Sequence, residues 1–88
     1  MINLNSVQKL LKKNGFIFAN IFQNDDGTFE EDYIKGDFFC TLSINCNRSV
    51  TMITMDEVFL NSDKKWERKT QSETNLVDAI KKFGWNTK

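Results

Sequence analysis

Apolar side chains recur at three- and four-residue steps near both ends of the chain, and this spacing predicts one amphipathic helix at each end. The first helix is expected from about Asn3 to Asn14, with Asn3 as its N-cap. The second is expected to begin with a capping box at 70–73, or with Ser72 itself as the cap. The two apolar stripes consist of Leu4, Val7, Leu10 and Leu11, and of Leu76, Val77, Ile80 and Phe83.

Both helices are expected to end with the same sequence pattern. An apolar residue, two lysines, any residue, a glycine and an aromatic residue occur in order at 11–16 and again at 80–85. Lysines in the last turn face the negative end of the helix dipole, and the glycine can adopt the left-handed conformation that ends a helix. We therefore expect Trp85 to fold back against Ile80 in a Schellman arrangement.

Between the helices the apolar period changes to two, which predicts β-strands. Strands are expected at 16–23, 38–46 and 50–60, and weaker ones at 28–35 and 64–69. Because 16–23 is apolar on both faces, it is expected to be central or covered on both sides. A change of phase near Met52 and Ile53 indicates a β-bulge. The predicted fold class is α+β: an N-terminal helix, a three- to four-stranded antiparallel sheet, and a C-terminal helix packed on the sheet.

Length and composition favour a single domain spanning 1–88. The 88 residues are 40% apolar and include eight Phe, which is enough for one core. The start lacks the pattern of a signal peptide, and no apolar run is long enough to span a membrane, so a cytoplasmic protein without membrane contact is expected. Cys40 and Cys46 would lie about 20 Å apart on one strand, too far for a disulfide, and are expected to be core residues.

The formal net charge is zero, but the charges are segregated along the chain. Residues 1–23 carry three lysines and no acid; residues 24–63 carry nine acids against two bases, a net of minus seven. Residues 64–88 carry seven bases against three acids, a net of plus four. A basic–acidic–basic order predicts a polarised surface that can steer association.

The sequence offers little for catalysis. It contains no histidine, so arrangements that pair histidine with a serine or cysteine nucleophile are excluded, and its four glycines are isolated rather than gathered in a phosphate-binding loop. Two cysteines without histidine are too few ligands for a structural zinc site. We therefore expect no catalytic residues, no metal site and no cofactor.

Two groups of residues are candidates for binding a macromolecule. The first is an acidic stretch with two aromatic residues, and the second is the pair of lysines at each helix end. Each has a simpler interpretation, since acids also solvate a hairpin tip and lysines also stabilise a helix C-terminus. The candidate protein-binding residues are Asp25, Asp26, Glu30, Glu31, Asp32, Phe39 and Trp66; the candidate nucleic-acid-binding residues are Lys12, Lys13, Lys81 and Lys82.

Two family resemblances bear on these alternatives. The opening run 6–16, followed by strands and a closing helix, resembles mRNA-interferase toxins of the HicA type, which implies a fold like that of double-stranded-RNA-binding domains. That family relies on a histidine in an early strand, which is missing here, so the resemblance implies a non-catalytic relative. In its small size, helix–sheet–helix order, acidic cluster and closing run 73–86, the chain is also similar to small phage inhibitors such as anti-CRISPR proteins.

The second resemblance implies a protein that sterically occupies a host nuclease or effector complex. We therefore expect a small non-enzymatic macromolecule-binding protein, an inhibitor or accessory factor of phage or mobile-element type that blocks a protein partner through the acidic stretch and nearby aromatics. The alternative is an RNA- or DNA-binding module of αβββα type that uses the basic helix ends. The sequence leaves the partner and the oligomeric state open.

Overall fold

The chain forms an α+β fold in which two helices lie on one side of an antiparallel sheet. The computed structural model describes residues 2–88. In chain order the elements are β1 (Ile2–Asn3), α1 (Leu4–Lys13), β2 (Ile17–Gln23), β3 (Phe29–Lys35), β4 (Phe38–Ile44), β5 (Ser49–Leu60), β6 (Trp66–Glu73) and α2 (Leu76–Phe83). Neither helix in 2–88 has the length or apolar character needed to cross a bilayer.

The sheet has six strands, where three or four were predicted. Strands β2 to β6 follow one another as hairpins, in the spatial order β2, β3, β4, β5. On the far side of β5, β1 pairs with its first residues and β6 with its second half. The strand that was not predicted is the short β1, which has no alternating pattern of its own. Both weaker predicted strands are present, as β3 and as a β6 that continues through Glu73. The prediction that residues 70–73 cap the second helix was therefore wrong.

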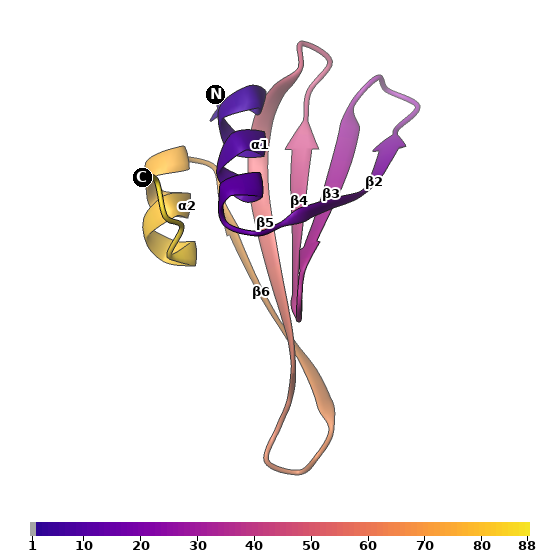
Figure 1. The fold of residues 1–88 in the computed structure, drawn as a ribbon. Coiled ribbons are helices and arrows are strands. Elements are labelled where there is room, and N and C mark those ends of the chain that lie inside the picture. Colours follow the sequence, from indigo (N-terminus) through magenta and orange to yellow (C-terminus); the bar gives the residue numbers. More distant parts are fainter. Residues whose placement is uncertain (1) are drawn as a thin grey trace.

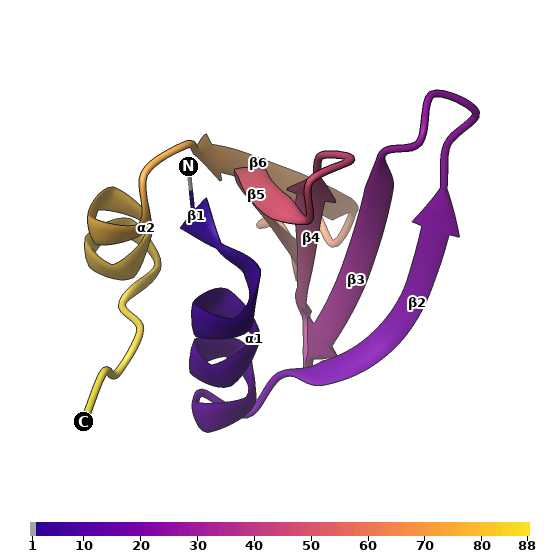
Figure 2. The same cartoon turned by 90° about the horizontal axis from the view of Figure 1, so that it is seen from above.

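Both helices cover the same face of the sheet, and nothing in residues 2–88 covers the opposite face (Figures 1 and 2). We call the uncovered side the open face. Helix α1 lies across the middle strands, whereas α2 lies beside α1 and contacts the sheet along β6. Strand β2 curves away from the helices at the outer edge of the sheet (Figure 2). The prediction that β2 is central was wrong, because every residue in it is exposed.

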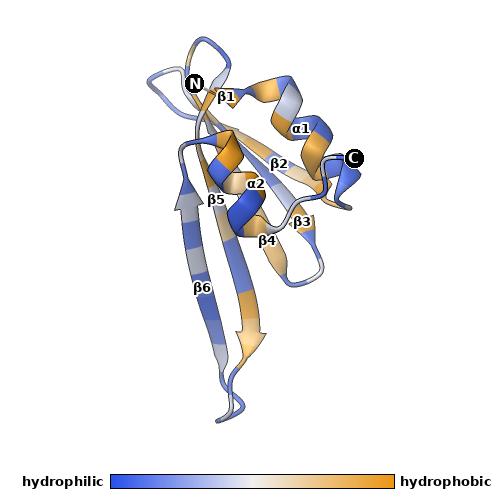
Figure 3. Cartoon of the chain, turned by 90° about the vertical axis from the view of Figure 1, so that its left-hand side faces the viewer, coloured by the Kyte–Doolittle hydropathy of each residue, from blue (hydrophilic) through white to orange (hydrophobic). Residues whose placement is uncertain are grey.

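The β5–β6 hairpin extends well beyond the helices as a twisted arm (Figures 1 and 3). Its outer part pairs Val58 with Arg68 and Leu60 with Trp66. Figure 3 shows β6 as mainly hydrophilic, and charged side chains such as those of Arg68 and Lys69 are common on edge strands. The predicted bulge in β5 is present one residue earlier, at Thr51, where the register between β4 and β5 shifts.

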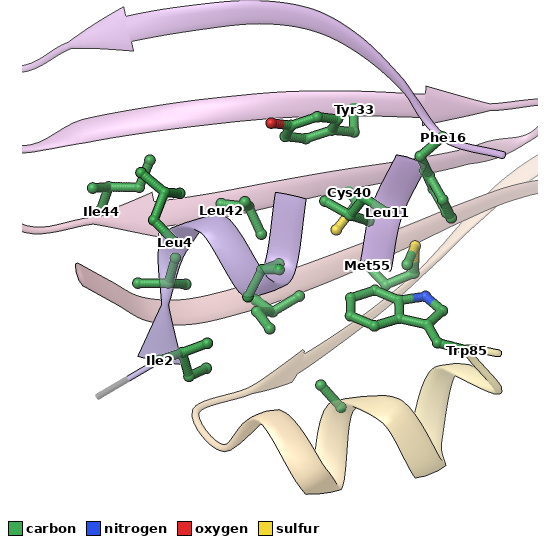
Figure 4. Packing of buried hydrophobic residues seen from close by; sticks show 14 residues of the cluster. Ile2, Leu4, Leu11, Phe16, Tyr33, Cys40, Leu42, Ile44, Met55 and Trp85 are labelled. Atoms are coloured by element: carbon green, nitrogen blue, oxygen red, sulfur yellow. The ribbon is translucent and has the colours of Figure 1, made fainter. Parts of the chain in front are cut away.

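The core lies between the helices and the covered face of the sheet (Figure 4). Alternate residues of β4 and β5 point into it, as the period-two pattern predicted, and α1 contributes its apolar stripe. Cys40 is buried there, but Cys46 lies in the exposed turn after β4, so its predicted core position was wrong. The largest fully buried side chains are Leu11, Leu42, Ile53, Val7, Val50 and Cys40.

Both helices end as predicted, at a glycine in the left-handed conformation. After α1, the Phe16 amide donates to the Leu11 carbonyl and the Gly15 amide to the Lys12 carbonyl, which is a complete Schellman motif. After α2, the Trp85 amide donates to Ile80 over 3.1 Å, and Gly84 has φ 68°. Trp85 is buried against Phe83, with their ring centroids 5.6 Å apart. The α2 N-cap is Asn75, whose side chain accepts from the Val77 and Asp78 amides.

Candidate interaction surfaces

The open face of the sheet brings together acidic and apolar side chains. The strand register defines two neighbouring rows that run across it. One row is polar and consists of Asn20, Asp32, Thr41, Thr54 and Ser72. The other begins with three large apolar residues and ends with polar ones, in the order Ile17, Ile34, Phe39, Asp56 and Thr70.

The acids of the open face differ in how available they are. Glu30 is exposed, whereas Asp32 is buried and accepts a hydrogen bond from the Thr41 hydroxyl at 3.1 Å. Asp56, in the next row, accepts from the Thr70 hydroxyl. Glu30 is therefore the acid most available to a partner, while Asp32 and Asp56 are held within the polar rows.

Glu31 points to the other side of the sheet, into the covered face. Its side chain is 6% exposed, and its Oε1 accepts from Gln8 Nε2 at 2.9 Å and from the Tyr33 hydroxyl at 2.8 Å. Burial, reinforced by the bond to Glu31, raises the pKa of Tyr33 above its ordinary value. Glu31 thus ties α1 to β3 and lies apart from the other candidate acids.

Asp25 and Asp26 lie in the exposed turn between β2 and β3, as predicted. Asp26 accepts from the Thr28 hydroxyl at 2.6 Å and from the Thr28 amide at 3.0 Å. These two bonds lower the pKa of Asp26. The turn therefore presents two carboxylates at the end of the hairpin, beyond the open face itself.

The two candidate aromatic residues lie far apart. Phe39 is on the open face between Ile34 and Asp56, whereas Trp66 is 70% exposed near the end of the arm. The predicted protein-binding set is thus divided among the turn, the open face, the arm and the interior. Only Glu30, Asp32 and Phe39 share one surface.

The segments that follow the two lysine pairs are joined directly by hydrogen bonds. The Asn14 side chain donates to the Asn86 carbonyl at 3.0 Å and accepts from the Asn86 amide at 2.7 Å. Lys12 and Lys13 end α1, and Lys81 and Lys82 end α2. Lys82 forms an ion pair with Glu73 at 2.9 Å, and the other three lysines are exposed.

A pocket of about 280 Å³ lies between the helix ends and the covered face of the sheet. Its wall includes Asn14, Phe16, Phe83 and Trp85, and it brings Lys35 and Lys69 to the same place as Lys82. Lys35 also lies over the Phe16 ring, 5.8 Å from its centroid. Sequence reasoning missed Lys35 and Lys69, because they join the helix ends only through the register of β3, β5 and β6.

The buried Cys40 thiol has its pKa raised to about 12, first by burial and then by the negative charges of Asp32 and Asp56, which makes it a poor nucleophile at neutral pH. Within residues 2–88, no three potential metal-ligating side chains come close enough to hold an ion.

Comparisons with known proteins give no match: no family model, no curated protein and no solved structure resembles this chain significantly. The proposals below therefore rest on the geometry and charge of the chain itself.

Proposed function

We propose that this chain is a non-enzymatic binding protein that engages the basic surface of a protein partner with the open face of its sheet. The observation that supports this proposal is the grouping of Glu30, Asp32 and Phe39 on one uncovered face, next to the exposed Ile34. Protein interfaces typically combine a central apolar or aromatic cluster with a polar rim.

The open face has that composition. Phe39, Ile34 and Ile17 are neighbours in one row, and each leaves a substantial part of its side chain exposed. Glu30, and the turn acids Asp25 and Asp26, lie toward the other end of the β2–β3 hairpin and give this side a negative charge. A basic partner surface, such as one that holds nucleic acid, complements this arrangement, and its occupation would block the partner sterically.

The test is capture of the partner from the native host's lysate with single-residue variants. We expect Phe39→Ala to reduce capture by at least tenfold, because exposed aromatics at the centre of an interface contribute most to affinity. Glu30→Lys should reduce capture mainly at low salt, where charge attraction acts over a longer range. Val77→Ala is the matched control, since Val77 is an exposed apolar residue on α2. Equal capture by all four proteins would contradict the proposal.

A second candidate function is binding of RNA or DNA through the joined helix ends. The Asn14–Asn86 bonds favour it, because they join the end of α1, which carries Lys12 and Lys13, to the segment that follows Lys81 and Lys82. Binding of this kind should weaken steeply with salt, and the slope should decrease when lysines are neutralised.

Fluorescence anisotropy with labelled RNA and DNA distinguishes the two functions. The double variant Lys12→Gln/Lys13→Gln should lose most of the affinity under the second hypothesis. Lys64→Gln/Lys65→Gln is the matched control, because these lysines lie in the exposed turn of the arm. No binding by the wild-type chain at low salt would rule out this function and leave the first unaffected.

A further inference from the structure

Strand β2 is an edge strand that is uncovered on both faces. It pairs only with β3, and its other side carries the unpaired backbone groups of a free edge. Its large apolar residues are about half-exposed or more: 68% for Ile17, 51% for Phe18, 48% for Ile21 and 50% for Phe22. Such an edge is a template for pairing with another strand.

The opposite side of the same sheet shows how an edge is normally protected. Strand β6 has the sequence Trp-Glu-Arg-Lys-Thr-Gln-Ser-Glu, with four charged side chains. Strand β2 has the sequence Ile-Phe-Ala-Asn-Ile-Phe-Gln, with no charged residue and no proline. Its only protective feature is a bulge at Ala19, where the register with β3 shifts.

We propose that two copies of this chain form a dimer by antiparallel pairing of their β2 strands about a twofold axis. The occupant is a second copy because the apolar part of β2 is complementary to itself when reversed. In the matching register, Ile17 of one copy lies opposite Phe22 of the other, Phe18 opposite Ile21, and Ala19 opposite Asn20. Pairs of an aromatic and a β-branched residue across strands are among the most favourable in antiparallel sheets.

The bulge makes this register consistent with the two faces of the sheet. Ile17 pairs with Ile34 and Phe22 with Glu30, which places both on the open face. Phe18 pairs with Tyr33 and Ile21 with Glu31, which places both on the covered face. Residues that lie opposite each other must share a face, and in a regular strand positions 17 and 22 would not. The extra residue at Ala19 restores the match on both faces.

The backbone of β2 is also suited to this register. The Ile21 amide donates to the Asn20 side chain at 2.8 Å, as expected of an amide that points to the free side of the strand. In the dimer, the Ile21 amide can donate instead to the Phe18 carbonyl of the second copy, with the reciprocal bond across the axis. The Ile21 amide therefore has a hydrogen-bond acceptor in both states: the Asn20 side chain in the monomer and the β2 strand of the second copy in the dimer.

The size of the contact predicts a weak dimer. Half of a Phe side chain represents about 100 Å² on the scale for whole aromatic residues. Two Phe and two Ile side chains in each copy, all counted on this scale, give at most about 800 Å² in total, below the range of most stable complexes. We therefore expect a dissociation constant in the micromolar range or weaker. The two open faces remain on the same side of the joined sheet, so this proposal is independent of the one for the open face.

Sedimentation velocity over a range of concentrations tests the dimer. The wild-type chain should shift from monomer to dimer as the protein concentration rises from about 1 µM to 1 mM. The Phe18→Lys variant should need at least a tenfold higher concentration than the wild type to form the dimer. Val77→Lys is the matched control, because Val77 is 61% exposed and lies on α2. A wild-type chain that stays monomeric at 1 mM, or a Val77→Lys variant as defective as Phe18→Lys, would overturn the proposal.

Disulfide trapping tests the register. In a Cys46→Ser background, which removes the exposed native thiol, the double variant Ile17→Cys/Phe22→Cys should form a covalent dimer on mild oxidation. The two single variants should not, because equal positions in the two copies would lie about 15 Å apart, beyond disulfide reach. Crosslinking by the single variants, or none by the double variant at concentrations where the dimer forms, would overturn this register. A β2 edge occupied by a different protein would give a monomeric chain in both assays and likewise contradict the proposal.

Discussion

The two hydrogen bonds between Asn14 and Asn86 form a bridge between the helix ends, and this bridge gives a quantitative prediction. Asn14 follows α1, and its side chain makes three hydrogen bonds: one to the Leu10 carbonyl at 2.8 Å and two with the backbone of Asn86. The substitution Asn14→Ala removes all three and leaves the helix-ending glycine intact. It should therefore loosen the attachment of the C-terminal segment while α1 itself remains folded.

The expected cost follows from the number and exposure of these bonds. A hydrogen bond contributes about 0.5–1.5 kcal/mol net to stability, and less where water can replace it. Asn14 is half-buried and Asn86 is exposed, so three bonds near the lower limit give about 1.5–2 kcal/mol. For a domain of this size, a loss of 1 kcal/mol lowers the melting temperature by roughly 4–8 °C.

A double-mutant cycle isolates the bridge from other effects of Asn14. Deletion of residues 86–88 removes the partner backbone, so Asn14→Ala in that background should cost only about 0.5–1 kcal/mol, for the bond to Leu10. Urea unfolding can be followed by the fluorescence of Trp85, which is buried, once Trp66→Phe has removed the only other tryptophan. Asn47→Ala, in an exposed turn, controls for generic effects of the substitution. Strictly additive losses would refute the assignment of the bridge as a stabilising contact.

Three further predictions follow from burial and backbone conformation. A thiol reagent should modify the exposed Cys46 at once and the buried Cys40 only on unfolding. The folded Cys40 keeps its proton to about pH 12, whereas an unfolded thiol loses it near pH 9, so the free energy of unfolding should fall as the pH rises above 9. Urea midpoints at pH 8 and 10.5 measure this fall, which should be smaller in Cys40→Ala. Leu42→Ala should cost about 2–5 kcal/mol by leaving a cavity, whereas the exposed Leu60→Ala should change the free energy of unfolding by less than about 0.5 kcal/mol, and similar values for both would contradict the assigned core. Gly84→Ala should cost about 1–2 kcal/mol through backbone strain alone, since a Cβ there meets no atom within 4 Å; an unchanged urea midpoint would argue against the left-handed conformation.

The features that the sequence predicted well are those set by neighbours along the chain. Asn3 caps α1, and the sequence pattern repeated at 11–16 and 80–85 ends both helices with the expected hydrogen bonds. The alternation in β4 also placed Cys40 and Leu42 in the core. Caps, helix stops and alternation involve residues only a few positions apart, so their physical causes are visible in a single stretch of sequence.

The errors concern properties that depend on distant strands. Both faces of β2 are apolar, which indicated a central strand. The position of β2 in the sheet depends instead on the order of strand pairing, and this order leaves β2 at the edge. Ser72 and its neighbours have the composition of a helix cap, yet Ser72 bonds Thr54 across β5 and β6 instead. For Glu31 a signal was present in the sequence, because Glu31 lies midway between Phe29 and Tyr33 in the predicted strand 28–35. Alternate residues of a strand point to the same face, so the side chain of Glu31 shares the direction of these two aromatic residues.

The pairing of Ile2 and Asn3 with β5 has a consequence for how the chain folds. Every other strand pair joins neighbours in sequence through a short turn, so most of the sheet can assemble hairpin by hairpin with little loss of loop entropy. The contact of β1 with Ser49 and Val50 instead closes a loop over half the chain, and α1 begins immediately after it. We expect this closure to come late in folding, so that the N-terminal strand and α1 dock together onto a sheet that has already formed.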